Sequence, residues 1–260
     1  GGRRQRQMVI RDRPYSQPMT AAPPSIAASA LDAIGNTPLV KLNRIVPEGS
    51  ADVYVKLEYY NPTGSKKDRM ALAMIEGAER RGELRPGMSV VEFSGGSTGS
   101  GLAFVCAVKD YHFHIISADP FGKEKLDTMT AFGAELEVIE SPDGKITAEV
   151  IRAMIGRAAE LAEDENYFFT NQLNNEDVID GFRRLGEEII EQIDGPIHAF
   201  CESVGTGGTI TGVAKRLKEE IPGIKVIGVD PVGSILGGGT TVEPYLVEGI
   251  GYDFFPDVLD

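Results

Sequence analysis

Three short loops rich in glycine and hydroxyl groups hold the residues of this sequence that could do chemistry. In the first, Asn61–Arg69, Lys67 follows a Gly64-Ser65 turn and opens a predicted helix. The positive end of a helix dipole disfavours an ammonium group, so we expect the pKa of Lys67 to be lowered. A neutral lysine amine is what Schiff-base chemistry requires. A solvated basic patch is the alternative interpretation of this motif.

The second loop directly follows the apolar run at 89–93 and consists of Ser94, Gly95, Gly96, Ser97 and Thr98. Its small residues leave backbone N–H groups and hydroxyls free to bind an anion such as a carboxylate. The loop also matches the G-x-S-x-G pattern of serine hydrolases. A hydrolase needs a histidine on a later loop, and the three histidines, at positions 112, 114 and 198, all fall in predicted strands. The sequence therefore disfavours a hydrolase.

The third loop lies between a predicted strand and a predicted helix and consists of Gly205, Thr206, Gly207, Gly208 and Thr209. Backbone N–H groups, two hydroxyls and a helix N-terminus are the chemistry of a phosphate site. The loop departs from the dinucleotide fingerprint G-x-G-x-x-G because Ile210 occupies the last glycine position. Alone it could be a tight turn. Combined with a reactive lysine, it indicates a phosphate-bearing aldehyde, pyridoxal phosphate.

The elements that must position these loops alternate regularly from Ser89 onward. Strands are predicted at 89–93, 112–118, 134–140, 167–169, 197–204 and 225–231. Helices are predicted at 67–80, 101–108, 123–132, 146–162, 178–192 and 210–220. This alternation is typical of parallel βαβ units covered on both faces, so the fold class is α/β. In such folds ligands bind outside the carboxyl ends of the strands, where all three loops fall.

Composition excludes several kinds of partner. The 260 residues include 26 Lys and Arg against 39 Asp and Glu, a formal net charge of −13. An acidic chain lacks the positive surface that binds phosphate backbones or anionic lipids, so neither nucleic acid nor a membrane is expected as a partner. The sequence has no apolar run of about 18 residues, so no membrane span is predicted.

The remaining reactive side chains have simpler interpretations. Cys106 and Cys201 lie in apolar stretches and are predicted to be packing residues. Two such cysteines make no disulfide framework, which predicts a cytoplasmic protein. His112 and His114 share a strand face without a third ligand, so no metal site is predicted. A solvated acidic helix face is predicted at Glu187, Glu188 and Glu191.

Several motifs resemble one family in both order and spacing. They are IGNTPLVKLN (34–43), NPTGSKKDR (61–69), SGGSTG (94–99), SVGTGGTITG (203–212), GVDPVGS (228–234) and VEGIG (247–251). Together they resemble the pyridoxal-phosphate-dependent cysteine synthase and cystathionine β-synthase family, of the tryptophan-synthase-β fold type. The resemblance runs from about Ile34 to the last residues.

This resemblance implies two interleaved lobes, each a mostly parallel sheet flanked by helices (pyridoxal-phosphate fold type II). Residues 31–56 and 176–260 would form the larger lobe, which binds the cofactor phosphate. Residues 57–175 would form a smaller, movable lobe with the substrate loop. Residues 1–30 are predicted to be a flexible arm or a tag. Family members continue past the GIG motif, so the C-terminal part of the larger lobe is expected to be missing.

The resemblance also assigns residues. Lys67 is implied to form the internal aldimine with pyridoxal phosphate and to be the catalytic residue. The cofactor is implied to contact Ser97, Gly205, Thr206, Gly207, Gly208 and Thr209. The amino-acid substrate is implied to contact Ser94, Gly95, Gly96, Ser97, Thr98, Gln172 and Gly249. Lys66 stands where the family usually has an apolar residue and is not the candidate.

One departure concerns the substrate loop, which in the family usually reads T-S-G-N-T-G. Here Ser97 replaces the asparagine that normally hydrogen-bonds the 3′-oxygen of the cofactor. The shorter serine would reach that oxygen through water, which affects reaction specificity more than cofactor binding.

The function implied is β-replacement on an activated serine such as O-acetylserine, with sulfide, to give cysteine through an aminoacrylate. Small amino-acid and sulfide partners and a homodimer are implied with it. Two alternatives stay open. One is a β-eliminating lyase, a serine dehydratase or a cystathionine β-synthase on the same fold. The other is a catalytically inactive, pyridoxal-phosphate-binding regulatory protein.

Overall fold

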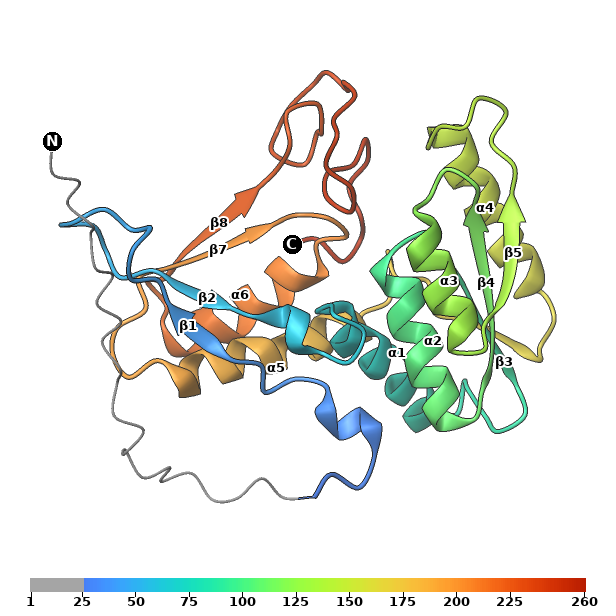
Figure 1. Ribbon diagram of the computed structural model, residues 1–260, viewed down its shortest axis with the longest axis horizontal. Helices are drawn as coiled ribbons and strands as arrows, with labels where there is room; N and C mark the ends of the chain where they lie inside the picture. Colours follow the sequence, from blue (N-terminus) through green and yellow to red (C-terminus); the bar gives the residue numbers. More distant parts are fainter. Residues whose placement is uncertain (1–25) are drawn as a thin grey trace, which may run out of the picture.

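Two lobes lie on either side of helix α1 (Lys67–Arg81) in the computed structural model, which describes residues 26–260 (Figure 1). One lobe holds the four strands that come next after α1 in sequence. The other combines strands from the beginning and the end of the chain, so the lobes are interleaved. Most of the arm predicted at residues 1–30 lies outside the described residues. The lobe boundaries at 56/57 and 175/176 stay a prediction.

The first lobe is built on a four-stranded sheet in the order β5-β4-β3-β6. Its strands are β3 (Ser89–Phe93), β4 (His112–Ala118), β5 (Glu135–Ile139) and β6 (Tyr167–Phe169), and every pairing is parallel. The strand sequences are nearly continuous apolar runs because both faces are covered. Helices α2 (Ser97–Lys109) and α3 (Lys123–Ala131) pack on one face, and α4 (Ala148–Leu161) packs on the other.

The second lobe contains two short strand pairs. Strand β1 (Leu39–Lys41) pairs antiparallel with β2 (Tyr54–Lys56), and β7 (Ala199–Ser203) pairs parallel with β8 (Lys225–Val229). Helices α5 (Asp177–Gln192) and α6 (Gly208–Glu220) pack beside them, and two 3₁₀ turns lie at Ala30–Ala33 and Glu58–Tyr60. The predicted α/β class, with a parallel sheet flanked by helices, is confirmed.

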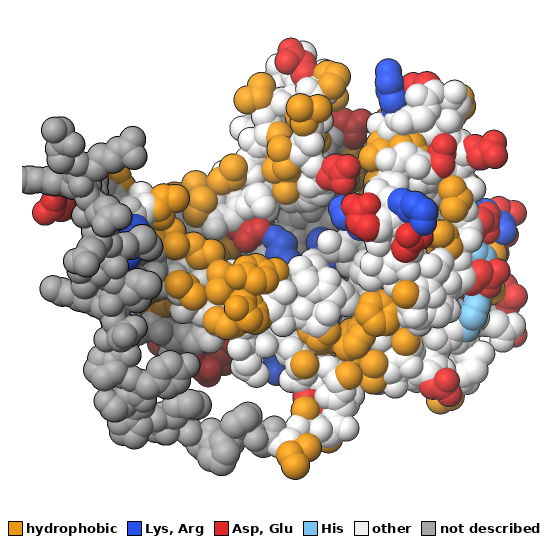
Figure 2. Space-filling view, in the orientation of Figure 1, with side chains coloured by type: hydrophobic (Ala, Val, Ile, Leu, Met, Phe, Trp, Pro, Cys, Tyr) orange, Lys and Arg blue, Asp and Glu red, His pale blue; other side chains and the backbone are white. Residues whose placement is uncertain are grey.

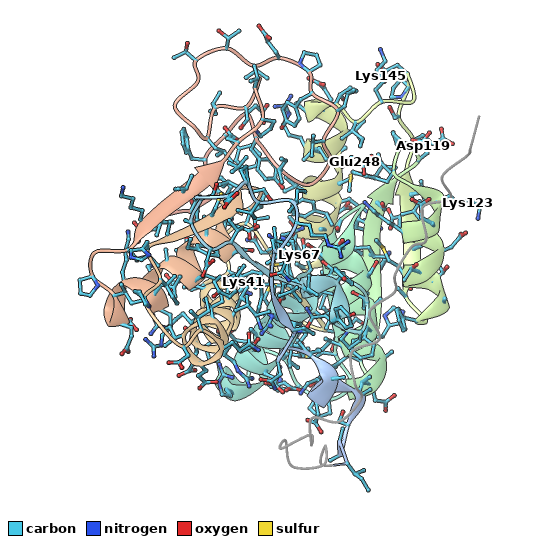
Figure 3. The ribbon with its side chains drawn as sticks, turned by 60° about the vertical axis from the view of Figure 1, so that its left-hand side comes forward. Lys41, Lys67, Asp119, Lys123, Lys145 and Glu248 are labelled. Carbon is cyan, nitrogen blue, oxygen red and sulfur yellow. The ribbon has the colours of Figure 1, made fainter. Side chains whose placement is uncertain are left out.

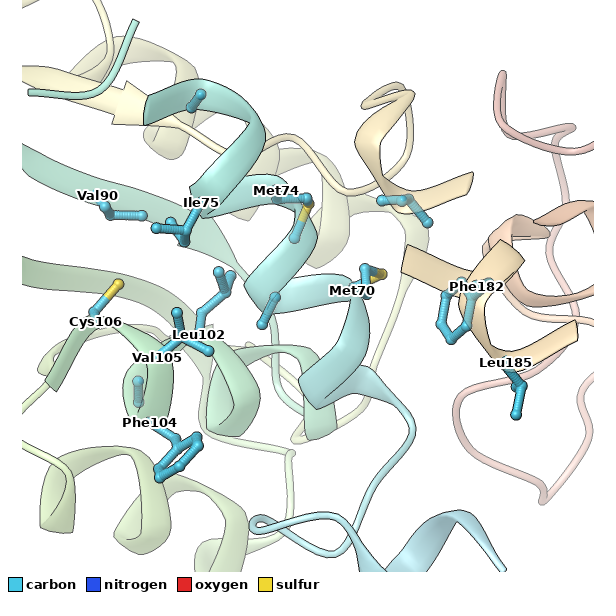
Figure 4. Packing of buried hydrophobic residues seen from close by; sticks show 14 of the residues in the cluster. Met70, Met74, Ile75, Val90, Leu102, Phe104, Val105, Cys106, Phe182 and Leu185 are labelled. Atoms are coloured by element: carbon cyan, nitrogen blue, oxygen red, sulfur yellow. The ribbon is translucent and has the colours of Figure 1, made fainter. Parts of the chain in front are cut away.

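Helix α1 is the packing centre of the molecule. Met70 and Met74 on α1 are fully buried between Leu102 of α2 and Phe182 of α5 (Figure 4). Burial of each such side chain stabilises the fold by about 2 kcal/mol. This shared core fixes where α1 begins, and hence where Lys67 lies.

Two glycines let the flanking helices approach the first turn of α1 closely. A Cβ on Gly101 of α2 would lie 3.2 Å from the carbonyl oxygen of Lys67, and a Cβ on Gly181 of α5 would lie 2.9 Å from that of Arg69. Contacts tighter than ordinary van der Waals distance would push the helices apart. The backbone around Lys67 is therefore held from two sides.

Three sequence predictions differ from the structure. Helix α2 begins at Ser97 and not at Gly101, because Ser97, Thr98 and Gly99 form its first turn. Glu188, predicted to be solvated, is 8% exposed and pairs with Arg69 and Lys56. Cys201, predicted to pack in the core, is exposed because it lies on the uncovered face of the β7–β8 pair. Among the described residues, no helix is long and apolar enough to cross a membrane.

Candidate active site

The loop before α1 is ordered by its own polar side chains. Gly64 adopts a left-handed backbone conformation with φ of 77°. Asp68 accepts hydrogen bonds from the backbone N–H of Thr63 at 2.8 Å and from the Thr63 hydroxyl. The hydroxyl of Ser65 accepts the backbone N–H of Lys67 at 3.2 Å. These contacts set the point at which Lys67 enters the helix.

Lys67 lies near the centre of the molecule, where the two lobes meet (Figure 3). Burial, and after it the positive charge of Lys66, lower the pKa of Lys67 to about 8 against the opposing effects of Glu202 and Glu92. The predicted direction of the pKa change is therefore correct, and burial is its main cause. An amine with a pKa near 8 is neutral in a far larger fraction of molecules at physiological pH than an ordinary lysine, and the neutral form is the one that nucleophilic attack requires.

Lys66 connects the start of α1 to the other lobe. Its Nζ forms an ion pair with Glu202 at the end of β7, three residues before Gly205. The pair holds the start of α1 close to the strand that leads into the phosphate loop. Two regions separated by more than 130 residues in sequence are thereby brought together.

The predicted substrate loop, Ser94–Thr98, joins the end of β3 to the first turn of α2. Because β3 and β6 are parallel neighbours, their carboxyl ends lie side by side, and the segment after β6 carries Gln172. The Gln172 side chain accepts a hydrogen bond from the Thr98 hydroxyl at 2.8 Å and donates to the carbonyl oxygen of Phe93 at 3.1 Å. The structure therefore brings Gln172 to this loop.

Two further residues at this loop were not singled out in the sequence. A Cβ on Gly95 would lie 1.9 Å from the ring of Phe121, so that ring covers the glycine. Glu92 is fully buried one residue before the end of β3. A glutamate within the apolar run SVVEF is a signal that could have identified Glu92 in advance, because carboxylates are rarely fully buried without a role.

The third loop has the shape that a phosphate group needs. The first N–H groups of an α-helix have no carbonyl partner within the helix, and Gly208, Thr209 and Ile210 open α6. Gly207 precedes them with a φ of 88°, in the left-handed region. A Cβ on Gly208 would lie 2.2 Å from Val178, so the loop also requires glycine for packing. These residues fit a dianionic phosphate bound by backbone dipoles.

Gly249 lies directly against this phosphate loop. A Cβ on Gly205 would be 2.4 Å from the carbonyl oxygen of Gly249, and the N–H of Gly251 donates to Val204 at 2.8 Å. The loop 247–251 also reaches the other lobe, where Glu248 forms an ion pair of 3.3 Å with Lys125 of α3. The surface is hollowed between the lobes beside this segment, with basic and acidic side chains close together (Figure 2).

The predicted residues therefore gather in three places around the junction of the lobes. Lys67 opens α1, the substrate loop and Gln172 lie at the carboxyl ends of β3 and β6, and the phosphate loop follows β7. Ser97 is the first residue of α2. This arrangement combines one amine of lowered pKa with two loops whose chemistry suits an anion.

Comparison with known proteins establishes the class. Residues 30–260 match the family described as pyridoxal-phosphate dependent enzyme. The chain belongs to this family, and its cofactor is pyridoxal phosphate.

Particular relatives agree with this assignment. A cysteine synthase from Staphylococcus aureus is 42% identical over 229 residues, which cover 87% of this chain and 72% of the relative. Cystathionine beta-synthase from Rattus norvegicus is 40% identical over 266 residues, which cover 96% of this chain and 46% of the relative. The crystal structure of a cysteine synthase from Entamoeba histolytica superimposes with a TM-score of 0.84 at 34% identity, covering 94% of this chain and 73% of that one.

Proposed function

We propose that this protein makes cysteine from an activated serine, such as O-acetylserine, and sulfide. The observation that carries the proposal is the position of Lys67. Its amine has a pKa of about 8, and its neighbour Lys66 is ion-paired to the strand that enters the phosphate loop. The similarity to cysteine synthases supports the reaction class, β-replacement.

Each part of the site has a separate task in this proposal. Pyridoxal phosphate, when bound, supplies an electron sink that stabilises negative charge at Cα of the amino acid. The phosphate loop Gly205–Thr209 holds the cofactor through N–H groups and hydroxyls. Lys67 would hold the cofactor through its Nζ in the resting enzyme. Once the substrate amine has displaced it, the freed Nζ would take the proton from Cα of the substrate.

The substrate loop binds the carboxylate of the amino acid. Ser94–Thr98 offers backbone N–H groups and hydroxyls, and Gln172 holds Thr98 in place. Binding of the carboxylate would draw the smaller lobe toward the larger one and exclude water, which competes with sulfide. Phe121, which lies over Gly95, would narrow access to this loop.

The test is incubation of the cofactor-loaded protein with O-acetylserine, with and without sulfide. We expect cysteine to form when both are present, and little pyruvate when sulfide is absent. Pyruvate as the main product would contradict β-replacement and identify a β-eliminating lyase. No change in the cofactor spectrum on adding the amino acid would indicate an inactive cofactor-binding protein.

We also infer that the protein acts in the cytoplasm as a homodimer and binds no nucleic acid. The family resemblance supports the dimer, and the net charge of −13 argues against nucleic acid. Light scattering of the purified protein at micromolar concentration is expected to give about twice the mass of one chain. A monomer mass under the same conditions would contradict the dimer.

A further inference from the structure

A buried carboxyl group lies directly behind the substrate loop. Glu92 is 0% exposed and stands two residues before Ser94. We propose that Glu92 is a positioning residue for substrate binding, because it fixes the backbone of Gln172 and Gln172 holds Thr98. The inference rests on the proposed function in one respect, the assignment of Ser94–Thr98 as the carboxylate loop.

The hydrogen bonds of Glu92 join two neighbouring strand ends. Its Oε1 accepts the backbone N–H of Phe93 at 2.9 Å. Its Oε2 accepts the hydroxyl of Thr170 at 2.6 Å and the backbone N–H of Gln172 at 3.0 Å. Thr170 and Gln172 follow β6, whereas Phe93 ends β3. One carboxyl group therefore joins the end of β3, which leads into the substrate loop, to the segment after β6, which carries Gln172.

Gln172 extends this connection to the loop itself. Its amide oxygen accepts from the Thr98 hydroxyl and its amide nitrogen donates to the carbonyl of Phe93, so both ends of the amide are used. Rotation of the amide would break both bonds. Asn171, the residue before it, has a φ of 46°, a left-handed conformation that asparagine adopts more readily than most residues. The Glu92 hydrogen bond to the Gln172 N–H fixes the backbone directly after this turn.

The cost of burying this group argues against a role in packing alone. Val90 occupies the same face of β3 two residues earlier, and an apolar side chain at position 92 would avoid the desolvation of a carboxyl group. That desolvation raises the pKa of Glu92 to about 7. A carboxyl group that is retained in spite of this cost must accept hydrogen bonds that an apolar side chain could not accept. The Thr170 hydroxyl and the Gln172 N–H, which follow β6, donate such hydrogen bonds.

The first experiment uses the chain without cofactor, so it does not depend on turnover. Hydrogen exchange of the amides in 94–98 and at 172 is measured by mass spectrometry in the wild type, in Glu92→Gln and in Glu188→Gln. Glu188 is the matched control, a buried glutamate that also accepts several hydrogen bonds but lies at Arg69 and Lys56. We expect Glu92→Gln to raise exchange in the loop about 10-fold, because the amide has one acceptor oxygen for the three donors and leaves a buried donor without a partner.

Glu188→Gln is expected to lower the melting temperature and to leave exchange in the loop unchanged. Equal exchange in the loop for Glu92→Gln and wild type would overturn the proposal. So would an equal rise in both variants, because the effect would then follow from lower global stability.

The second experiment uses the cofactor-loaded enzyme. Glu92→Gln is expected to raise KM for O-acetylserine about 10-fold while kcat changes less than about 3-fold and KM for sulfide is unchanged. Thr170→Val is expected to raise the same KM, and Thr170→Ser, which keeps the hydroxyl, to restore it. An unchanged KM in both Glu92→Gln and Thr170→Val would overturn the proposal. If the wild type fails to convert O-acetylserine, the proposed function fails, and the exchange experiment still decides the role of Glu92.

Discussion

Two buried groups of charged side chains lie at the two ends of the first turn of α1, and they differ in how their charges are balanced. In the Arg69 group, Glu58 and Glu188 meet Arg69 and Lys56, which makes two anions and two cations. In the Lys67 group, Lys67 is half-buried, the carboxyl group of Glu92 is fully buried, and the hydrogen bonds of Glu92 come from uncharged donors. Lys67 and Arg69 are two residues apart.

The pKa values follow this difference. Burial alone would raise the pKa of Glu188, but hydrogen bonds from Arg69 and Lys56 lower it to about 2. Burial raises the pKa of Glu92 to about 7 and lowers that of Lys67 to about 8. Matched ion pairs fix a charge state and stabilise structure, whereas buried groups without such partners titrate near neutral pH, where proton transfer is possible. The comparison separates the structural charges of this protein from the reactive ones.

The largest effect is expected from breaking the balanced group. Arg69→Met leaves Glu58 without its cation and Glu188 with Lys56 alone, so it is expected to lower the free energy of unfolding by about 3–5 kcal/mol. Urea denaturation measures this loss. Lys123→Met is the control, because Lys123 pairs with Asp127 on the surface and its removal is expected to cost less than about 1 kcal/mol. Equal losses in the two variants would contradict the structural role of the Arg69 group.

A smaller effect is expected from the pH dependence of stability at Glu92. The unfolded chain loses this proton near the ordinary pKa of 4.5, whereas the folded protein keeps it to about pH 7. The stability contributed by the bound proton is therefore fully present below pH 4.5 and is lost as the pH rises to 7. The difference between the two pKa values corresponds to at most about 3 kcal/mol.

Urea denaturation of the wild type and of Glu92→Gln at several pH values between 4.5 and 8 tests this sign. The free energy of unfolding of the wild type is expected to fall relative to that of the variant as the pH rises. Parallel curves for the two proteins over this range would show that Glu92 has an ordinary pKa.

The smallest effect is expected at the Lys66–Glu202 ion pair. Lys66→Met removes a positive charge beside Lys67 and leaves the negative Glu202, so the pKa of Lys67 is expected to rise by about 0.5–1. Glu202→Gln is expected to lower it. The pH dependence of the reaction of the cofactor-free amine with an acylating reagent measures both, site by site, by mass spectrometry. Shifts of the same sign in the two variants would contradict the electrostatic account.

The strands of the smaller lobe were predictable because strands buried on both faces have nearly continuous apolar sequences. The predicted bounds of β3, β4 and β6 agree with the structure, at 89–93, 112–118 and 167–169. The start of α2 was not predictable in this way, because glycine and serine in its first turn have low helix propensity and tertiary packing overrides it.

The candidate site was predictable where backbone chemistry is local, as in the two glycine loops and the lysine at the start of α1. Partners distant in sequence were not. The burial of Glu188 depends on Arg69, 119 residues earlier, and nothing in the acidic run around it indicates that pairing. The ion pair between Lys66 and Glu202 spans 136 residues and is hidden for the same reason.

The central claim is that Lys67, and not its neighbour Lys66, is the lysine that binds the cofactor. The direct test is reduction of the cofactor-loaded protein with borohydride, followed by digestion and mass spectrometry of the peptide that contains both lysines. We predict that the pyridoxyl group is found on Lys67, and that Lys67→Ala carries no label and forms no cysteine while Lys66→Met is labelled as the wild type is. A pyridoxyl group on Lys66, or cysteine formation by Lys67→Ala, would contradict the account.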